Sequence, residues 1–283
     1  MRKYLFLIAI TSIFSISSIA QKSDTAILFH IIKIIKNGNL YGSWGYNEET
    51  YTKSNLYIVQ PGLNNNYVFN GIQAHDHIGW DHLFSVQPTI PQYNMRLGYF
   101  FNKNQDFGFE INFDHTKYVV ESGYNVRLNG KFHGRNADTI VPVNYNTLQY
   151  QLNNGANFVL FNLVKKFTFL NVFNKNIVIC GLIKLGVGPV IPHVANVIFG
   201  DPNRLQFQFG GWDVGTEGTI RVIFFQHIYF EYCNKLDYAR YSWLEIYDGR
   251  AHQSFGTYEN IANIGYTIHL NHKKYPLSAD KRK

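Results

Sequence analysis

The stretch FGFEINFDHTK, residues 107–117, alternates apolar and polar side chains along most of its length. Successive side chains of a β-strand point to opposite faces, so this segment would have one apolar face and one polar face. The apolar face carries Phe107, Phe109, Ile111 and Phe113, and the polar face carries Glu110, Asn112 and Asp114. A strand with lipid outside and a polar interior behind it has this pattern, which favours a transmembrane β-barrel over a soluble sandwich.

Seven further segments alternate in a similar way, and several carry Tyr, Phe or Trp near their ends. Because turn residues separate consecutive segments, they predict an all-β fold, a transmembrane antiparallel up-and-down barrel. An even number of strands returns the last one to the side where the first began. The eight expected strands cover 39–50, 91–102, 105–117, 155–167, 176–189, 205–224, 227–239 and 256–270, which make a barrel domain over 39–270.

The connections between these strands fall into two size classes, which is typical of barrels with short periplasmic turns and long outer loops. Segments 54–60 and 66–76 in the first long connection also alternate. We expect them to form an outer hairpin, and a ten-stranded barrel is the alternative. The short connections lie at Asn102–Gln105, Thr168–Lys175 and near Gln226, and the long ones are 51–90, 118–154, 190–204 and 240–255.

The N-terminal residues have the features of an export signal. Two basic residues precede an apolar run that ends at Ile16, and Ser18-Ile19-Ala20 provides the small side chains that signal peptidase reads. We therefore expect a signal peptide over residues 1–20. Residues 21–38 would form a periplasmic segment, in which 24–36 is either a short interfacial helix or an extended lead-in to the first strand.

Composition excludes other classes of membrane protein. No later stretch reaches the roughly 18 to 20 apolar residues that a membrane-spanning helix needs. Aromatic residues make up 17% of the chain and charged residues 16%, which suits strands that face lipid on one side. Part of the net charge of +7 lies in a basic C-terminal tail, residues 271–283. We interpret it as a solvated end near anionic lipid headgroups, and we expect no nucleic-acid partner.

Two cysteines are present, Cys180 and Cys233. An exported protein meets an oxidising compartment, so a disulfide has to be considered. The two residues fall on strands that are two apart in the expected barrel. At about 4.8 Å per strand, their Cα atoms would lie beyond the ~7 Å that a disulfide spans. We therefore expect both thiols to be free.

The period of two also predicts which charged residues face the lumen. An eight-stranded barrel has an interior just wide enough for its side chains, so charges of both signs would neutralise one another and fill it. A channel is the alternative. Pairing across the turn at Asn102–Gln105 places Arg96 within reach of two of the acidic residues. The predicted lumenal charges are Arg96, Glu110, Asp114, Lys184, Asp213, Glu217, Arg221, Glu231 and Lys235.

Four segments are distinctive in combination: Ser43-Trp44-Gly45-Tyr46-Asn47, Tyr51-Thr52-Lys53-Ser54, Ile111–Tyr118 and Asn154-Gly155-Ala156-Asn157-Phe158. Together they resemble an uncharacterised family of outer-membrane β-barrel proteins found mainly in Bacteroidota. The resemblance spans most of the chain after the signal and implies a barrel fold in the bacterial outer membrane, without an established activity. The family pattern has an acidic residue at the position of Asp76, but not the histidines on either side of it.

Residues 74–82 read AHDHIGWDH and concentrate three histidines and two carboxylates. On a strand, His75 and His77 would point to the same side, and with His82 they are candidate ligands for a divalent metal. The spacing matches no specific zinc signature. The alternative is a polar outer loop whose side chains hydrogen-bond to one another at the level of the lipid headgroups.

A second candidate site lies at the upper end of the strand that ends near residue 117. Asp114 and His115, with a loop serine such as Ser54 or Ser122 as nucleophile, contain the groups that acyl transfer or deacylation needs. Alternation, however, directs Asp114 inward and His115 outward, so they would not form a dyad on one face. The alternative is a polar rim that anchors the outer loops.

None of these motifs is specific for catalysis. We therefore expect a non-catalytic outer-membrane protein that stabilises the membrane or binds a partner through 51–90 and 118–154. The alternatives are a lipid A-modifying acyl-hydrolase or acyltransferase and a narrow passive pore for small solutes. The expected partners are outer-membrane lipid and lipopolysaccharide, together with an extracellular ligand. We expect a monomer and no cofactor.

Overall fold

The computed structural model describes residues 38–77, 79, 91–101, 105–152, 154–173 and 176–270. The expected signal peptide, nearly all of the segment that follows it, and the basic tail lie outside these residues, as does His82. Within the described part of the chain, no helix has the length and apolar composition needed to cross a membrane.

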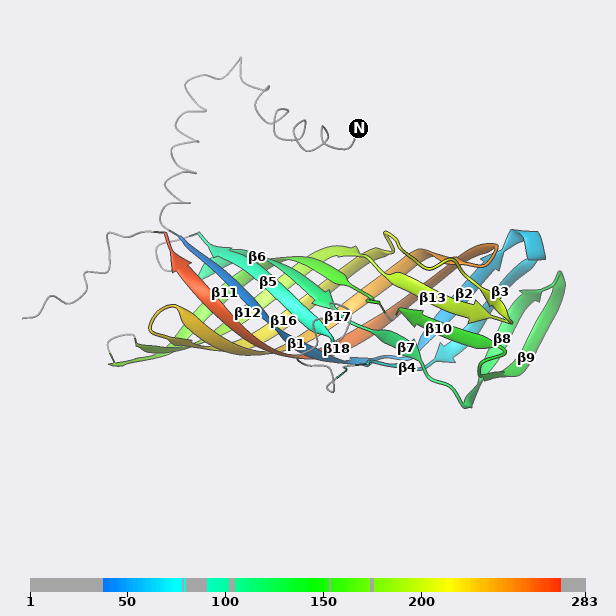
Figure 1. Cartoon of the computed structure of the whole chain (residues 1–283), viewed down its shortest axis with the longest axis horizontal. Coiled ribbons are helices and arrows are strands. Elements are labelled where there is room, and N and C mark those ends of the chain that lie inside the picture. The colour runs from blue at the N-terminus through cyan, green and yellow to red at the C-terminus, as the bar shows by residue number, and fades with distance from the viewer. Residues whose placement is uncertain are drawn as a thin grey trace, which may run out of the picture.

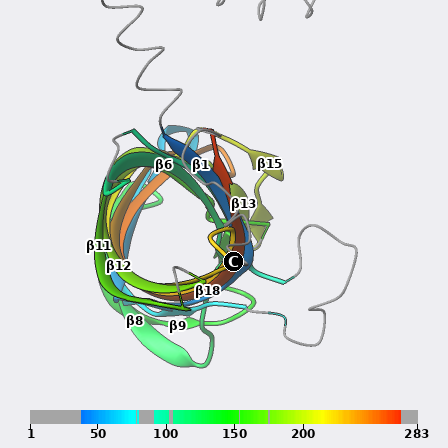
Figure 2. The same cartoon turned by 90° about the vertical axis from the view of Figure 1, so that its left-hand side faces the viewer.

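Eight strands form a closed antiparallel barrel, as predicted. Each strand pairs with the next around the ring, and the last pairs back with the first. Ring order equals chain order, so the barrel is of the up-and-down kind, and Figure 2 shows the ring in a view along the barrel. The strands are β1 (Asn39–Tyr51), β5 (Tyr93–Phe100), β6 (Phe107–His115), β11 (Phe158–Val172), β12 (Ile177–Val190), β16 (Gly211–Phe224), β17 (Ile228–Ile246) and β18 (Gly249–His269).

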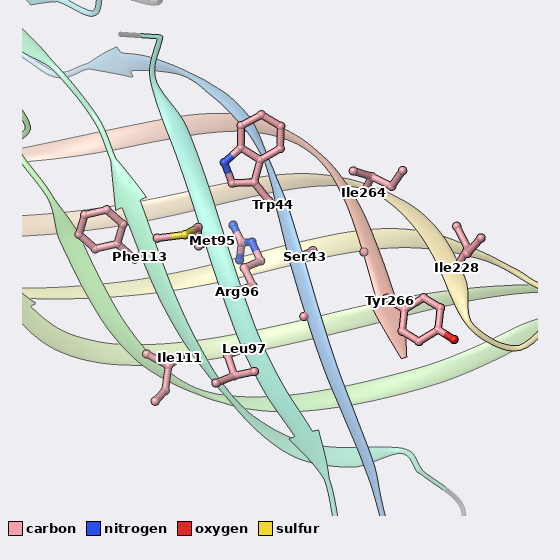
Figure 3. Close-up of a pocket in the computed structure, with 12 residues that line it drawn as sticks. Ser43, Trp44, Met95, Arg96, Leu97, Ile111, Phe113, Ile228, Ile264 and Tyr266 are labelled. Carbon is pink, nitrogen blue, oxygen red and sulfur yellow. The ribbon is translucent and has the colours of Figure 1, made fainter. Parts of the chain in front are cut away.

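The barrel wall alternates as the sequence predicts, and β5 illustrates it. Met95 and Leu97 are 46% and 55% exposed, whereas Arg96 between them is 3% exposed. Figure 3 shows these side chains beside Trp44 of β1, where outward-facing residues line an apolar groove. Large apolar side chains are exposed on all eight strands of the ring. The wall is therefore apolar outside, and its polar side chains are buried inside.

The prediction of a long loop at 240–255 is wrong, because β17 and β18 continue through this region as a paired hairpin. The strands meet at a tight turn, in which Asp248 has a left-handed φ of 47°. Trp243 has a φ of 64°, at a shift of register between the two strands. A β-bulge of this kind interrupts the period of two, which is the signal that sequence reading follows.

The predicted outer hairpin is confirmed. It consists of β2 (Ser54–Gln60) and β3 (Asn65–Ile72), which are joined by the 3-10 turn η1 (Pro61–Leu63). β2 also pairs with β18, so it continues the line of β1 along the same partner strand. Neither β2 nor β3 enters the closed ring, which has eight strands and not ten.

The connections 118–154 and 190–204, predicted as long loops, also contain strands. A hairpin of β8 (Tyr124–Phe132) and β9 (Arg135–Val143) pairs with β3 through β8. Most side chains of β9 are exposed, so the sequence carries little period-two signal there. Residues 205–210, expected to open the sixth strand, contribute only a short one. The short strands are β4 (Ala74–His75), β7 (Tyr118–Val120), β10 (Leu148–Leu152), β13 (His193–Ile198), β14 (Asp201–Pro202) and β15 (Gln206–Phe207).

The two ends of the barrel differ. Figure 1 shows β2, β3, β8 and β9 gathered at one end, which we call the long-strand end. The opposite end has brief connections between β5 and β6, β11 and β12, and β16 and β17, and we call it the short-turn end. The long connections after β1, β6 and β12 therefore lie opposite the short turns, as the sequence predicts, whereas the tight turn between β17 and β18 is a short connection at the long-strand end.

The interior is layered along the barrel axis. Along β17, the buried residue Tyr229 belongs to a small apolar cluster, and Ala239 and Tyr241 belong to a much larger one. Between them lie the buried positions Glu231 to Asp237, which include three charged side chains. A charged layer thus occupies the middle of the lumen, with apolar layers toward both ends.

Cys180 and Cys233 are both buried and free, as predicted. Cys180 lies on β12 and Cys233 on β17, and β16 runs between these two strands. The spacing of the strands keeps the thiols apart in the way that the sequence indicates.

Gly98 of β5 is a point of close packing in the lumen. A Cβ atom added there would collide with the ring of Tyr41, which reaches across from β1. Since Tyr41 is 1% exposed and stacks on Phe100, the ring has little freedom to move. We expect Gly98→Ala to destabilise the folded barrel by about 1–3 kcal/mol, the usual cost of overpacking. Denaturant unfolding in detergent micelles measures this difference.

Gly218→Ala is the matched control, because Gly218 is exposed on β16 and an added Cβ would meet nothing within 4 Å. Its unfolding midpoint should stay at the wild-type value. Equal stability of the two variants would show that the Tyr41 ring can move to make room for a Cβ atom at position 98, and would contradict this prediction.

Candidate functional site

Two ion pairs cross the lumen from wall to wall. Arg96 on β5 reaches Glu217 on β16, with an N–O distance of 2.6 Å. β5 and β16 are four places apart in the ring of eight and therefore lie on opposite walls. Lys235 on β17 reaches Asp114 on β6 at 2.8 Å, and these strands are also four apart. Side chains from facing walls are thus in direct contact at two levels of the lumen.

The first level is a compact network of two cations and two carboxylates. Arg96 and Lys184 each contact both Glu110 and Glu217, and the four N–O distances range from 2.6 to 3.4 Å. The hydroxyl of Tyr41 donates a hydrogen bond to Glu110 over 2.9 Å. Each charge has partners of opposite sign, which is the condition under which buried ions are tolerated.

Toward the short-turn end, Arg221 extends this network. Its guanidinium contacts Glu231 at 2.8 Å and lies over the rings of Tyr41 and Tyr229, 4.6 and 4.1 Å from their centroids. Cation–π contacts of this kind gain strength when they are shielded from water. Aromatic rings and an ion pair together occupy this end of the lumen.

The second level has a different balance of charge. Lys235 contacts three carboxylates, those of Asp114, Asp237 and Glu259, at 2.8, 2.8 and 3.1 Å. Asp114 also lies 3.6 Å from Arg96, which joins the two levels. The Asp213 side chain, the last of the nine predicted lumenal charges, is fully buried close to this cluster and forms no ion pair with another described residue. Acidic groups therefore outnumber cations around Lys235.

Sequence reading placed Lys235 in the lumen but did not single out its neighbours Asp237 and Glu259. The signal for Asp237 was present, because it lies two residues beyond Lys235 and so shares its face. Glu259 pairs directly with Lys235 across the β17–β18 ladder. Only the register between the strands identifies that partner, and register was not available from one sequence.

A layer of aromatic rings covers the Lys235 network on the side of the long-strand end. Phe255 of β18 is 1% exposed and lies within 4.5 to 5.4 Å, centroid to centroid, of the rings of Tyr51, Tyr118 and Tyr241. The hydroxyl of Tyr241 donates to the backbone carbonyl of Ala156 over 3.0 Å. Apolar side chains fill the lumen at this level, and ion pairs fill it on the side nearer the short-turn end.

The structure describes two of the three histidines of the candidate metal site. His75 and His77 are both exposed, whereas the Asp76 carboxylate between them accepts a hydrogen bond from the backbone N–H of Glu49 over 2.8 Å. The third candidate, His82, lies outside the described residues. Within the part of the chain that the structure covers, no group of three histidine, cysteine or acidic side chains is placed to hold a metal ion.

The groups proposed for acyl transfer are also separated. Asp114 contacts Lys235 in the lumen, whereas His115 lies on the other side of β6, where its ring stacks on Tyr93 and hydrogen-bonds to Asn157 over 2.8 Å. These positions follow from alternation along the strand.

Of the two candidate serines, Ser54 is buried in a separate network. The amide of Gln253 donates to the Ser54 hydroxyl over 2.8 Å and to the Tyr118 hydroxyl over 2.6 Å. The other, Ser122, is exposed in the connection between β7 and β8. Lys117, which follows His115 in the chain, is buried. The structure therefore assembles no nucleophile, base and acid from these side chains.

Comparison with known proteins finds similarity in fold only. No family model and no curated protein sequence matches the chain. The outer-membrane protease OmpT of Escherichia coli is 8% identical over 82% of this chain and 97% of that chain, with a TM-score of 0.41. The outer-membrane protein OprG of Pseudomonas aeruginosa is 11% identical over 82% of this chain and 96% of that chain, with a TM-score of 0.38.

The attachment invasion locus protein Ail of Yersinia pestis, in complex with the heparin analogue sucrose octasulfate, is 14% identical over 82% of this chain and 99% of that chain, with a TM-score of 0.32. At these identities and scores, the similarity carries no inference about function.

Proposed function

We propose that this chain is a non-catalytic β-barrel of the bacterial outer membrane that is sealed through its lumen and acts through its long-strand end. The observation that carries the proposal is the pair of ion pairs that join opposite walls, Arg96–Glu217 and Lys235–Asp114. A wide aqueous passage needs the facing walls to be apart, and here their side chains are in contact. The aromatic layer around Phe255 adds a second, apolar seal.

The outer surface supports the membrane location. Trp212, Tyr238 and Tyr258 are exposed on the neighbouring strands β16, β17 and β18, and we call these three residues the aromatic girdle. Tyr and Trp concentrate where a membrane meets water, and the outward side chains on the short-turn side of the girdle are mostly apolar. Because short turns face the periplasm in barrels of this kind, the long-strand end would face the outside of the cell.

The long-strand end offers a surface for an external partner. Its outermost hairpin is braced by Arg127 and Asp138, whose two hydrogen bonds across the β8–β9 ladder both measure 2.6 Å. In the described residues β9 pairs with β8 alone, so its other edge presents backbone donors and acceptors. A free strand edge is a common docking site for an extended segment of another molecule.

Ion conduction tests the sealed lumen. With the barrel inserted in a planar lipid bilayer, we expect no step-like current above that of the bare membrane, because buried ion pairs and rings occupy the lumen. An open porin in the same setup provides the positive control. Stable unitary currents would contradict the seal and favour the narrow pore.

Lipid A from cells with and without the chain tests the enzyme alternative by mass spectrometry. We expect the same acyl pattern in both, because Asp114, His115 and Ser54 do not form a catalytic group. A change in acyl chains that the His115→Ala variant abolishes would overturn the proposal.

A further inference from the structure

A polar pocket of about 470 Å³ lies on the outer face of the wall, where β1 passes into β2 beside β18. We call it the basic pocket and define it by Lys53, Tyr57, Tyr238, Arg240 and His252, five of its lining residues. All five side chains are exposed. The buried residues Ser54, Tyr241 and Gln253 form part of its lining, but none of the charged residues of the lumen does.

A β-bulge creates the pocket. Tyr51 pairs with Thr257, and Leu56 pairs with Gln253. The first and third of these residues are separated by five positions, but their partners on β18 are separated by four, so the segment from β1 to β2 contains one extra residue. The extra residue switches the outward positions from even numbers in β1 to odd numbers in β2, and Lys53 is exposed at the switch. A bulge of this kind opens the wall and re-aims side chains, which gives the pocket its depth.

The charge of the pocket is positive. Among the described residues that line it, none is acidic, and Lys53 and Arg240 form no ion pair with any other described residue. His252 is exposed beside Lys53 and Arg240 in the lining of the pocket. The ring of Tyr57 stacks on the His252 ring, with centroids 4.6 Å apart. His252 is thus oriented as a hydrogen-bonding group beside two cations.

The position of the pocket points to its occupant. Tyr238 belongs both to the pocket and to the aromatic girdle, and the next outward residue along β17 is Arg240. The girdle marks the level at which acyl chains give way to headgroups. The outward side chains therefore change from apolar to basic at the height where a lipid carries its phosphate.

A second apolar groove, of about 480 Å³, lies on the same wall, nearer the short-turn end than the pocket. Trp44, Tyr232 and Ala262 are among the residues that line it. Tyr232 is six residues from Tyr238 along β17, or roughly 20 Å. On a strand tilted by about 40°, that distance corresponds to about 15 Å of depth, the thickness of one leaflet's hydrocarbon layer. The same tilt moves the groove sideways by about 13 Å, so an acyl chain of a lipid whose headgroup is in the pocket would reach the groove by following the tilt of the strands.

We propose that Lys53, Arg240 and His252 bind the phosphate group of an outer-leaflet glycolipid, with an acyl chain lying in the groove below. The proposal rests on the membrane placement argued above. Arginine and lysine give charge-assisted hydrogen bonds to phosphate oxygens, and a ring N–H of His252 can donate a third hydrogen bond. The site fixes one lipid at the wall and is independent of what the long-strand end binds.

Binding of bisphosphorylated lipid A tests the proposal. The full barrel in detergent micelles is titrated with this lipid, and bound lipid is counted by native mass spectrometry. We expect the Lys53→Gln/Arg240→Gln variant to bind at least about tenfold more weakly than wild type, because two charge-assisted contacts are lost. Lipid A without phosphates should bind wild type no better than it binds the variant.

Lys131→Gln/Arg135→Gln is the matched control, since it removes the same charge from exposed positions of the β8–β9 hairpin. It should keep wild-type affinity. If both double variants bound the lipid equally weakly, the loss of affinity would be an effect of net charge alone, and the proposed site would be wrong. Equal binding of a soluble sugar phosphate would overturn a lipid as the occupant.

Folding and insertion are measured separately, by the gel mobility of unheated samples and by flotation with phosphatidylcholine vesicles. A barrel that fails to insert would contradict the proposed membrane function. A barrel that inserts but shows no phosphate-dependent binding would contradict only the lipid site. The two failures are therefore distinguishable.

Discussion

Replacing Lys235 by methionine should destabilise the barrel by about 3–5 kcal/mol, the usual cost of removing one partner of a buried ionic group. Lys235 contacts Asp114, Asp237 and Glu259, and all four side chains are nearly or fully buried. Without the ammonium group, Asp237 and Glu259 lose their ion-pair partner, and Asp114 keeps only its longer contact with Arg96, at 3.6 Å. Methionine has a similar length, so the loss measures charge and not volume. Denaturant unfolding in micelles, followed by tryptophan fluorescence, gives the difference.

Lys165→Met is the matched control. Lys165 forms an ion pair with Asp106 at 2.7 Å, but its side chain is 44% exposed. Exposed pairs contribute only about 0.2–1 kcal/mol, so this variant should unfold near the wild-type midpoint. In the lumen, the Lys235→Met/Asp237→Asn variant should recover part of the lost stability, because one unpaired carboxylate is removed with the cation. Similar losses from Lys235→Met and Lys165→Met would show that the buried network does not hold the walls together.

Replacing Phe255 by alanine should cost about 3–5 kcal/mol, because it leaves a cavity in the aromatic layer at the long-strand end. Tyr51, Tyr118 and Tyr241 all pack against this ring. The cavity cannot close easily, since Tyr118 and Tyr241 are also held by hydrogen bonds to Gln253 and to a backbone carbonyl. Unfolding measurements and the rate of proteolysis at the long-strand end both report the loss.

Phe209→Ala is the same substitution at a side chain that is 73% exposed. It should change stability by no more than about 0.5 kcal/mol. If Phe255→Ala were equally mild, the aromatic layer would not be a packed seal, and the conduction experiment on that variant would become the decisive one.

The membrane-facing part of the fold is predictable from this sequence because lipid and lumen impose opposite chemistry on alternate residues. In segment 107–117 the pattern gives the strand, its direction of burial and its lumenal charges together. The same rule places Arg96 and Lys235 inside. The outer hairpin at 54–60 and 66–76 was also recognisable, because its buried positions again alternate.

The long-strand end was much less predictable, for three physical reasons. The bulge at Trp243 breaks the period of two within β17. Most side chains of β9 face solvent on both sides, so the strand has no apolar face. The pairing of β2 with β18 joins residues about 200 positions apart, as the hydrogen bond from Gln253 to Ser54 does, and local patterns carry no information about such register.

The candidate sites, too, include features that local alternation predicts and features that depend on contacts between distant segments. Alternation alone separates Asp114 from His115, and the structure gives each its own partner. The basic pocket could not be predicted, because Lys53 and Arg240 come together only through the bulge between β1 and β2. Sequence reading assigned Lys53 to a distinctive segment and gave it no role.

The seam between β1 and β18 has a consequence for how the chain folds. Asn39 pairs with His269, and their side chains are hydrogen-bonded at 2.9 Å across 230 residues of sequence. Hairpins such as β16–β17 need only local contacts, but the seam requires the ends of the barrel to find each other, which is the slowest kind of contact to form. Until then, both terminal strands have bare edges that invite aggregation. We therefore expect closure of the β1–β18 seam to come late in folding, and the two edges to be exposed to aggregation until it forms.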